Sequence, residues 1–253
     1  FRIPDIIEKS GAKLVEVGTT NRTHIKDYED AITNNTKLIL WVHTSNYVIK
    51  GFTHAVSLKK LVTIGKKYKI PVMVDWGSGS LLDMRNLNVA NEKKIREIMK
   101  VQPDILTFSG DKLIGGPQSG LIIGKQEIIT SLQRNPIYRT IRCDKITIGL
   151  MEETLRNYKA ESFSKGNLSL TLLTTSRKKL LNRGKKILLN QTKRKIADLG
   201  IELIESYVEA GSGSLPEKKI ESAAIVFNPK SVKIEDLAKN LRCGGTPVVG
   251  YIS

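Results

Sequence analysis

Residues 104–124 read DILTFSGDKLIGGPQSGLIIG. The stretch begins with an apolar run at 104–108 and ends with a second one at 121–124, and a glycine-rich loop joins them. Short apolar runs bounded by turn residues are typical of buried strands. The loop is too short to hold a crossover helix, so we predict that the second strand returns antiparallel beside the first.

Two strand-and-helix units precede this stretch. Residues 38–42 form an apolar run, and apolar side chains then recur at helical spacing from 58 to 68. The pattern repeats with a strand at 70–74 and a helix at 92–100. The order βαβαβ predicts parallel strands. Together with the antiparallel member, this predicts an α/β fold with a mixed, mostly parallel sheet and flanking helices.

The second half of the chain has a different pattern. Helical periodicity dominates up to about residue 199, with one predicted face that carries Leu150, Thr154, Leu155 and Tyr158. Strands are predicted at 201–208 and 223–227, a helix begins near Ile234, and residues 247–252 are again strand-like. We therefore expect a large domain at 1–145, connecting helices at 146–200 and a smaller α+β lobe at 201–253.

Composition narrows the class of protein. The 253 residues suffice for a substantial core, and no apolar run approaches the roughly 20 residues that cross a bilayer, so we expect no membrane insertion. The only cysteines, Cys143 and Cys243, lie far apart and predict neither a metal site nor a disulfide framework. A reducing, cytoplasmic location is expected.

The chain is strongly basic, with 41 Lys and Arg against 25 Asp and Glu, a formal net charge of +16. Residues 163–197 contain ten basic residues and no acidic one. Such a segment attracts phosphodiester backbones by counterion release. A solvated helix face explains the same charges, and the segment alone does not decide between these interpretations.

Polar residues follow each of the first three predicted strands. His43 to Asn46 follow the first, Asp75 to Ser80 the second, and Ser109 to Gln118 the third. In open α/β sheets, ligands bind at the carboxyl ends of the strands. The sequence therefore places an acid, a lysine and several glycines along one rim.

Lys112 and Asp75 are the candidate catalytic residues on this rim. A lysine amine condenses with an aldehyde cofactor, and a carboxylate that faces a ring nitrogen keeps it protonated. The glycines around Lys112 allow the backbone to approach a bound ring. Taken singly, a solvated lysine and a strand-end turn explain these residues equally well, but their combination beside a Gly-Gly-Pro turn favours catalysis.

The loop at 110–119 that contains Lys112, here called the lysine loop, also resembles a known motif. Residues 108–118 closely resemble the cofactor-lysine segment of the bacterial selenocysteine synthases, the L-seryl-tRNA(Sec) selenium transferases. Further segments of the chain resemble this family in the same order, namely 17–24, 42–47, 51–53, 75–81 and 211–216. The resemblance covers nearly the whole chain.

The resemblance implies a fold-type-I pyridoxal-phosphate enzyme. Lys112 would carry the cofactor and Asp75 would pair with its ring nitrogen. Further candidates for cofactor contacts are Ser45, Asn46 and Ser109, which follow the ends of predicted strands. The implied reaction converts seryl-tRNA(Sec) to selenocysteinyl-tRNA(Sec) through a dehydroalanyl-tRNA, with selenophosphate as the selenium donor. From the residues alone, Ser45 and Asn46 are equally a turn or capping device.

A donor site is predicted shortly after the lysine loop. Arg139 and Arg142 stand at i and i+3, where two guanidinium groups share one face of a helix or turn and can clamp a tetrahedral oxyanion. Similarity to the family suggests the same role. Asp111 can orient the donor, or it can cap the loop. Without the family context, the arginines fit a basic surface near a helix start.

Relatives carry a long N-terminal portion that includes the cradle for the cofactor phosphate, so we interpret the chain as a fragment that lacks this part and the extreme C-terminus. Two other functions stay open. One is a related lyase that acts on a small amino acid or amino sugar, since the cofactor core does not name the substrate. The other is a non-catalytic tRNA-binding or assembly protein. Family resemblance implies a ring-like homo-oligomer.

Overall fold

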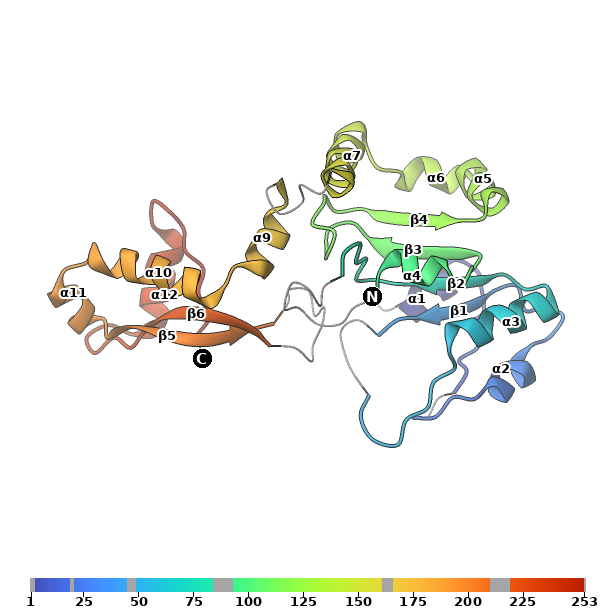
Figure 1. The fold of residues 1–253 in the computed structure, drawn as a ribbon, viewed down its shortest axis with the longest axis horizontal. Helices are drawn as coiled ribbons and strands as arrows, with labels where there is room; N and C mark the ends of the chain where they lie inside the picture. Colours follow the sequence, from blue (N-terminus) through green and yellow to red (C-terminus); the bar gives the residue numbers. More distant parts are fainter. Residues whose placement is uncertain are drawn as a thin grey trace. The chain divides into compact units, whose positions relative to one another are not determined.

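The computed structural model describes residues 3–18, 21–44, 49–83, 93–160, 166–209 and 219–252. These residues form two compact units, the first running to Thr171 and the second starting at Leu172 (Figure 1). This boundary falls inside the 146–200 segment that we expected to connect two lobes, so the helices of that segment are divided between the units.

The first unit is built on a four-stranded sheet in the order β1 (Ile39–Val42), β2 (Val72–Asp75), β3 (Ile105–Ser109) and β4 (Gly120–Gly124). The first three strands are parallel, and β4 is antiparallel to β3. The antiparallel return predicted from the short loop is therefore confirmed.

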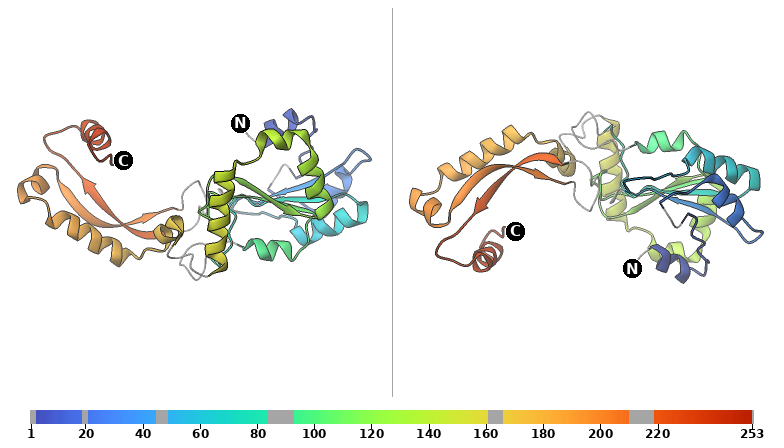
Figure 2. Two further views of the ribbon diagram at one scale, coloured as in Figure 1. Left: turned by 90° about the horizontal axis from the view of Figure 1, so that it is seen from above. Right: turned by 90° about the horizontal axis from the view of Figure 1, so that it is seen from below.

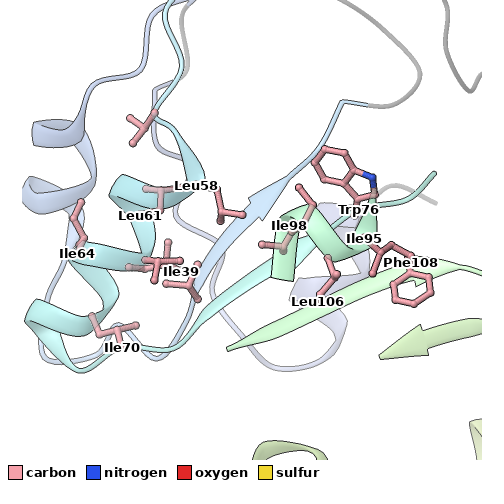
Figure 3. Packing of buried hydrophobic residues seen from close by; sticks show 14 of the residues in the cluster. Ile39, Leu58, Leu61, Ile64, Ile70, Trp76, Ile95, Ile98, Leu106 and Phe108 are labelled. Atoms are coloured by element: carbon pink, nitrogen blue, oxygen red, sulfur yellow. The ribbon is translucent and has the colours of Figure 1, made fainter. Parts of the chain in front are cut away.

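Helices α3 (Leu58–Tyr68) and α4 (Ile95–Met99) cover one face of this sheet (Figure 2). Of the residues of α3 predicted to face inward, Leu58, Leu61, Val62 and Gly65 are buried, whereas Tyr68 at the helix end is exposed. Gly65 lets the helix approach the sheet, because a Cβ there would lie 2.5 Å from Val72 Cγ2. Ile95 and Ile98 of α4 complete the core beside Leu106 (Figure 3). The buried apolar faces hold the strand ends in place.

Short helices α1 (Ile3–Lys9) and α2 (Ile25–Ala31) precede the sheet, and α5 (Gln126–Arg134), α6 (Pro136–Ile141) and α7 (Lys145–Lys159) follow it. Asp144 caps α7, since its Oδ1 accepts hydrogen bonds from the amides of Ile146 and Thr147 at 2.7 and 2.9 Å. Hydrogen bonds from Thr147 and Ile146 hold the pKa of the Asp144 carboxyl below its ordinary value.

The face of α7 that packs inward differs from the prediction. Met151 is the buried residue, with Thr154 and Tyr158 half-buried below it, whereas Leu150 and Leu155 are exposed. The buried face of α7 is therefore narrower than the apolar pattern predicted. The flexible Met151 side chain fills the space beside Gly110 and Gly116 of the loop that carries Lys112.

The second unit contains a two-stranded antiparallel sheet of β5 (Ile201–Val208) and β6 (Ile220–Phe227). Helix α10 (Arg177–Leu189) lies along one face and α12 (Ile234–Cys243) on the other side (Figure 2). Helix α11 (Lys193–Asp198) leads into β5, and α9 (Leu168–Thr174) contains the boundary between the units. The predicted small α+β arrangement is present.

The prediction of a strand at 247–252 is wrong, since the structure describes these residues without a strand. They are exposed and pair with neither strand, and only the amide of Val248 bonds back to the Leu241 carbonyl, at 2.8 Å. A strand needs a neighbour for its backbone groups, which this segment lacks. Among the helices that the structure describes, none is long and apolar enough to cross a membrane.

Candidate active site

The loop between β3 and β4 holds Lys112 in a closed backbone turn. The amide of Gly110 donates to the Ser119 carbonyl at 2.9 Å, and the amide of Gly116 donates to the Gly110 carbonyl at 2.9 Å. Within the loop, the amide of Gly115 donates to the Lys112 carbonyl at 2.9 Å. Lys112 is half-buried. The backbone around it is therefore fixed by hydrogen bonds of the loop itself.

Three glycines of this loop allow close packing from outside. Gly110 and Gly116 touch the end of Met151, and a Cβ at Gly116 would lie 2.8 Å from Met151 Cε. Gly115 has a φ of +68° and lies against the Asn167 side chain, so a residue with a Cβ would be strained there in two ways. The glycine-rich sequence thus lets α7 and Asn167 press on the loop.

Tyr158 and Asn167 hold the loop by its carbonyl groups. Tyr158 Oη donates to the Ile114 carbonyl at 2.8 Å and to the Leu113 carbonyl at 3.3 Å, and Asn167 Nδ2 donates to the Ile114 carbonyl at 2.6 Å. Burial raises the pKa of the Tyr158 phenol above its ordinary value. The sequence predicted Tyr158 only as part of a helix face, and no sequence pattern pointed to Asn167.

Asp75 is the last residue of β2, opposite Thr107 of β3. Thr107 Oγ1 donates to Asp75 Oδ1 at 3.2 Å, which orients the half-buried carboxylate. Ser109 ends β3 and is also half-buried. Asp75 and Lys112 therefore follow two neighbouring parallel strands at the same edge of the sheet, as the spacing predicted.

The turn after Asp75 contacts the lysine loop directly. The amide of Leu113 donates to the Ser78 carbonyl at 3.3 Å. Gly79, with a φ of +67°, comes so near β3 that a Cβ there would lie 2.7 Å from the Ser109 carbonyl oxygen. Ser78 and Ser80 are buried. The turn that follows Asp75 and the loop that carries Lys112 therefore pack against each other.

An aromatic stack borders this pair of loops at the end of β1. The His43 and Trp76 rings are nearly parallel, with centroids 3.7 Å apart and planes at 4°, and Trp41 follows at 5.9 Å from Trp76. The His43 amide donates to the Asp75 carbonyl at 2.9 Å. Trp76 is 2% exposed, and its Nε1 has no hydrogen-bond partner within the described chain. Ser45 and Asn46, predicted to contact the cofactor, lie outside the described residues.

The predicted donor residues are placed differently. Arg139 lies within α6, whereas Arg142 follows the helix end in an extended conformation, and both side chains are exposed. Asp111 is exposed as well. Within the described parts of the chain, no hydrogen bond or ion pair links these three side chains to one another or to Lys112. The structure therefore does not bring the arginines to the lysine loop.

The whole chain is similar in sequence to one family of known proteins. A sequence model of the L-seryl-tRNA selenium transferase family matches residues 1–253. The L-seryl-tRNA(Sec) selenium transferase of Alkaliphilus oremlandii is 42% identical over 253 residues, which cover 100% of this chain and 54% of that protein. Its counterpart in Escherichia fergusonii is 43% identical over 256 residues, with 100% of this chain and 55% of that protein covered. The chain thus spans about half the length of the curated relatives it matches.

A solved structure shows the fold. D-glucosaminate-6-phosphate ammonia-lyase aligns over 97% of this chain and 57% of its own, with a TM-score of 0.62 and 20% sequence identity. The architecture is that of the fold-type-I pyridoxal-phosphate enzymes, as expected. Because the family model covers every residue, the chain belongs to the L-seryl-tRNA selenium transferase family.

Proposed function

We propose that this chain is the catalytic core of an enzyme that converts seryl-tRNA(Sec) to selenocysteinyl-tRNA(Sec) with pyridoxal phosphate and selenophosphate. One observation carries the proposal. Asp75 ends β2 and Lys112 lies in the loop after β3, at the same edge of the sheet, and the Leu113 amide joins this loop to the turn after Asp75 through the Ser78 carbonyl. Membership of the family supports the substrate assignment.

The residues present fit pyridoxal phosphate. Lys112 offers an amine for the aldehyde, and Asp75, held by Thr107, offers a carboxylate for the ring nitrogen. The buried Nε1 of Trp76 has no hydrogen-bond partner among the described residues, so it is a polar group near this edge that a bound ligand can satisfy. We assign Ser109, and also Ser45 and Asn46, to cofactor binding. When bound, the cofactor supplies a ring that stabilises negative charge at the α carbon of the substrate.

The side chains then divide the remaining work. Asp75 keeps a proton on the ring nitrogen, and Thr107 keeps Asp75 in place. The Lys112 amine would lie beside the reacting atoms, where it could take the α proton of the seryl group. Loss of the α proton and of the β-hydroxyl, together as water, would leave a dehydroalanyl-tRNA. Addition of the selenium of selenophosphate to its β carbon, with hydrolysis of the Se–P bond, would give selenocysteinyl-tRNA and phosphate.

We assign the selenium donor to Arg139 and Arg142, with Asp111 as an orienting residue. Both guanidinium groups are exposed and form no ion pair with another described residue, so they are available to a tetrahedral oxyanion. Within the described chain, no hydrogen bond or ion pair joins these side chains to Lys112. Groups outside the described chain would therefore have to bring the bound donor to the reacting atoms. A homo-oligomer, expected from the family, can supply such groups. The two free cysteines fit a cytoplasmic location.

The test is transfer of radiolabelled selenium by the full-length protein from selenophosphate to seryl-tRNA(Sec). We expect labelled selenocysteinyl-tRNA only when pyridoxal phosphate and both substrates are present. A control reaction offers free serine and phosphorylated amino sugars in place of the tRNA. Ammonia release from these small substrates, without any selenium transfer to tRNA, would identify a lyase and contradict the proposal.

A further inference from the structure

Helix α10 has two faces of opposite character. Its inner face, formed by Leu180, Leu181, Gly184 and Leu188, lies toward the β5–β6 sheet and is buried or half-buried (Figures 1 and 2). Gly184 allows the closest approach, since a Cβ there would lie 2.5 Å from Leu203 Cδ1. The rotation of α10 about its axis is therefore fixed by packing.

Arg177, the first residue of α10, strengthens this attachment. Its Nη1 lies 2.8 Å from Glu205 Oε2 and its Nη2 lies 3.4 Å from Glu221 Oε1. The guanidinium also lies 5.0 Å from the centre of the Tyr207 ring, and the side chain is only 17% exposed. This arginine is used by the fold and is unavailable to an external partner.

The other five basic residues of α10 are used by nothing in the described chain. They are Lys178, Lys179, Arg183, Lys185 and Lys186. All five are exposed, their side chains make no ion pair or hydrogen bond to another described residue, and α10 contains no acidic residue. Lys179, Asn182, Arg183 and Lys186 follow the spacing i, i+3, i+4 and i+7. Together with Ser176 and Lys178 they line an open groove.

Like charges on one helix face repel one another, so this arrangement costs stability unless a counter-charge is bound. The seven residue steps from Lys179 to Lys186 extend about 10 Å along the helix, at ~1.5 Å per residue. That length exceeds one phosphate ion and suits a chain of phosphates. An amphipathic helix that inserts into a bilayer needs its apolar face free, whereas most of the apolar face of α10 is packed on the sheet.

We propose that the outer face of α10, defined by Lys179, Arg183 and Lys186, binds the phosphate backbone of RNA. The inference rests on the proposed function, in which the RNA is the substrate tRNA. It adds a contact surface in the second unit, distinct from the rim that carries Lys112. Phosphate contacts of this kind position a substrate and make its affinity depend on salt.

The experiment compares two triple variants of the full-length protein in binding to a fluorescent seryl-tRNA(Sec) transcript, measured by anisotropy over a range of KCl concentrations. The first variant is Lys179→Gln, Arg183→Gln and Lys186→Gln. The matched control, Lys59→Gln, Lys60→Gln and Lys66→Gln, removes the same charge from exposed positions of α3. Melting temperatures verify that both variants fold.

We expect the first variant to bind the tRNA roughly tenfold or more weakly at ~0.1 M salt, with a salt slope lower by about two to three. The α3 variant should stay within about twofold of the unmodified protein. Equal losses in both variants would reduce the effect to net charge and overturn the proposal. An unchanged salt slope in the first variant would also overturn it. Binding to vesicles that contain phosphatidylserine is measured in parallel, and a variant that loses vesicle binding but keeps its tRNA binding would overturn it too. If the unmodified protein binds no tRNA, the proposed function fails as well.

Discussion

The lysine loop at 110–119 and helix α6 both carry predicted site residues, but the chain holds them in different ways. The loop is fixed by its own backbone hydrogen bonds, by Tyr158 and Asn167, and by the turn after Asp75. Arg139 in α6 and Arg142 just after its end are exposed, and neither side chain has a hydrogen bond or ion pair to another described residue. The orientation of the lysine is therefore built into this unit, whereas the arginines depend on a ligand or another chain for theirs.

The largest expected effect concerns the carboxylate at the rim. Asp75→Ala removes the partner of the ring nitrogen, so serine β-elimination by the full-length protein should fall at least about a hundredfold. Asp111→Ala is the matched control, because Asp111 is an exposed acid beside Lys112 that makes no side-chain hydrogen bond or ion pair to another described residue. It should change elimination by no more than a few-fold. Nearly unchanged elimination in Asp75→Ala would show that another group protonates the ring.

The next effect concerns the hydroxyl that grips the lysine loop. Tyr158→Phe leaves the Leu113 and Ile114 carbonyls with one donor fewer, so the free energy of unfolding should fall by about 1 to 3 kcal/mol. Tyr138→Phe on the exposed α6 should change it by less than about 0.5 kcal/mol. Chemical denaturation measures both. Equal losses would remove the contrast between the two regions.

Tyr158 also gives a dependence on pH. Burial raises its pKa in the folded protein, so above about pH 10 the unfolded chain loses the phenolic proton while the folded chain keeps it. The stability that this group contributes is thus complete below about pH 10 and is lost as the pH rises further. Tyr158→Phe should weaken this alkaline decline, and an identical pH profile in the two proteins would contradict the assignment.

A smaller effect separates two glycines. Gly115→Ala places a Cβ at a φ of +68° against Asn167 and should cost about 1 to 2 kcal/mol of stability. Gly149→Ala in α7 meets no atom within 4 Å and should add about 0.5 to 1 kcal/mol by its helix propensity. Thermal unfolding of the two variants gives both signs. A stabilising Gly115→Ala would mean that the loop does not need its left-handed residue.

The sequence predicted most of the first unit because periodicity and loop length are local signals. The apolar spacing of α3 identified its buried side, and the short connection after Phe108 required the antiparallel β4. The sequence-based prediction failed where contacts between residues far apart in the sequence decide which side chains are buried and which segments pair. Leu150 has the same apolar character as a core residue yet is exposed, and Met151 is buried instead. Residues 247–252 have strand composition but find no partner strand.

The same limit applies to the candidate site. Asp75 and Lys112 were found because strand ends are visible in the sequence. The grip of Asn167 on the Ile114 carbonyl spans 53 residues and has no local pattern. The i, i+3 spacing of the two arginines suggested a shared helix face, but α6 ends at Ile141 and Arg142 leaves the helical conformation. Where a helix ends depends on the neighbouring Asp144 cap and on packing as much as on spacing.

The smallest expected effect on the fold concerns these arginines. Arg139→Ala with Arg142→Ala should lower the free energy of unfolding by less than about 0.5 kcal/mol, because both side chains are exposed and make no hydrogen bond or ion pair to another described residue. The same variant should raise the KM for selenophosphate roughly tenfold to a hundredfold per arginine while seryl-tRNA affinity changes far less. If tRNA binding collapses and donor saturation is unaffected, the pair belongs to the RNA surface.

The central claim is that Lys112 holds the cofactor. Borohydride reduction of the full-length protein with pyridoxal phosphate, followed by peptide mass mapping, tests it most directly. We predict one pyridoxyl group on the peptide that contains Lys112, and its absence in Lys112→Ala despite an unchanged melting temperature of the apoprotein. A pyridoxyl group on another lysine, with Lys112 unmodified, would contradict the account.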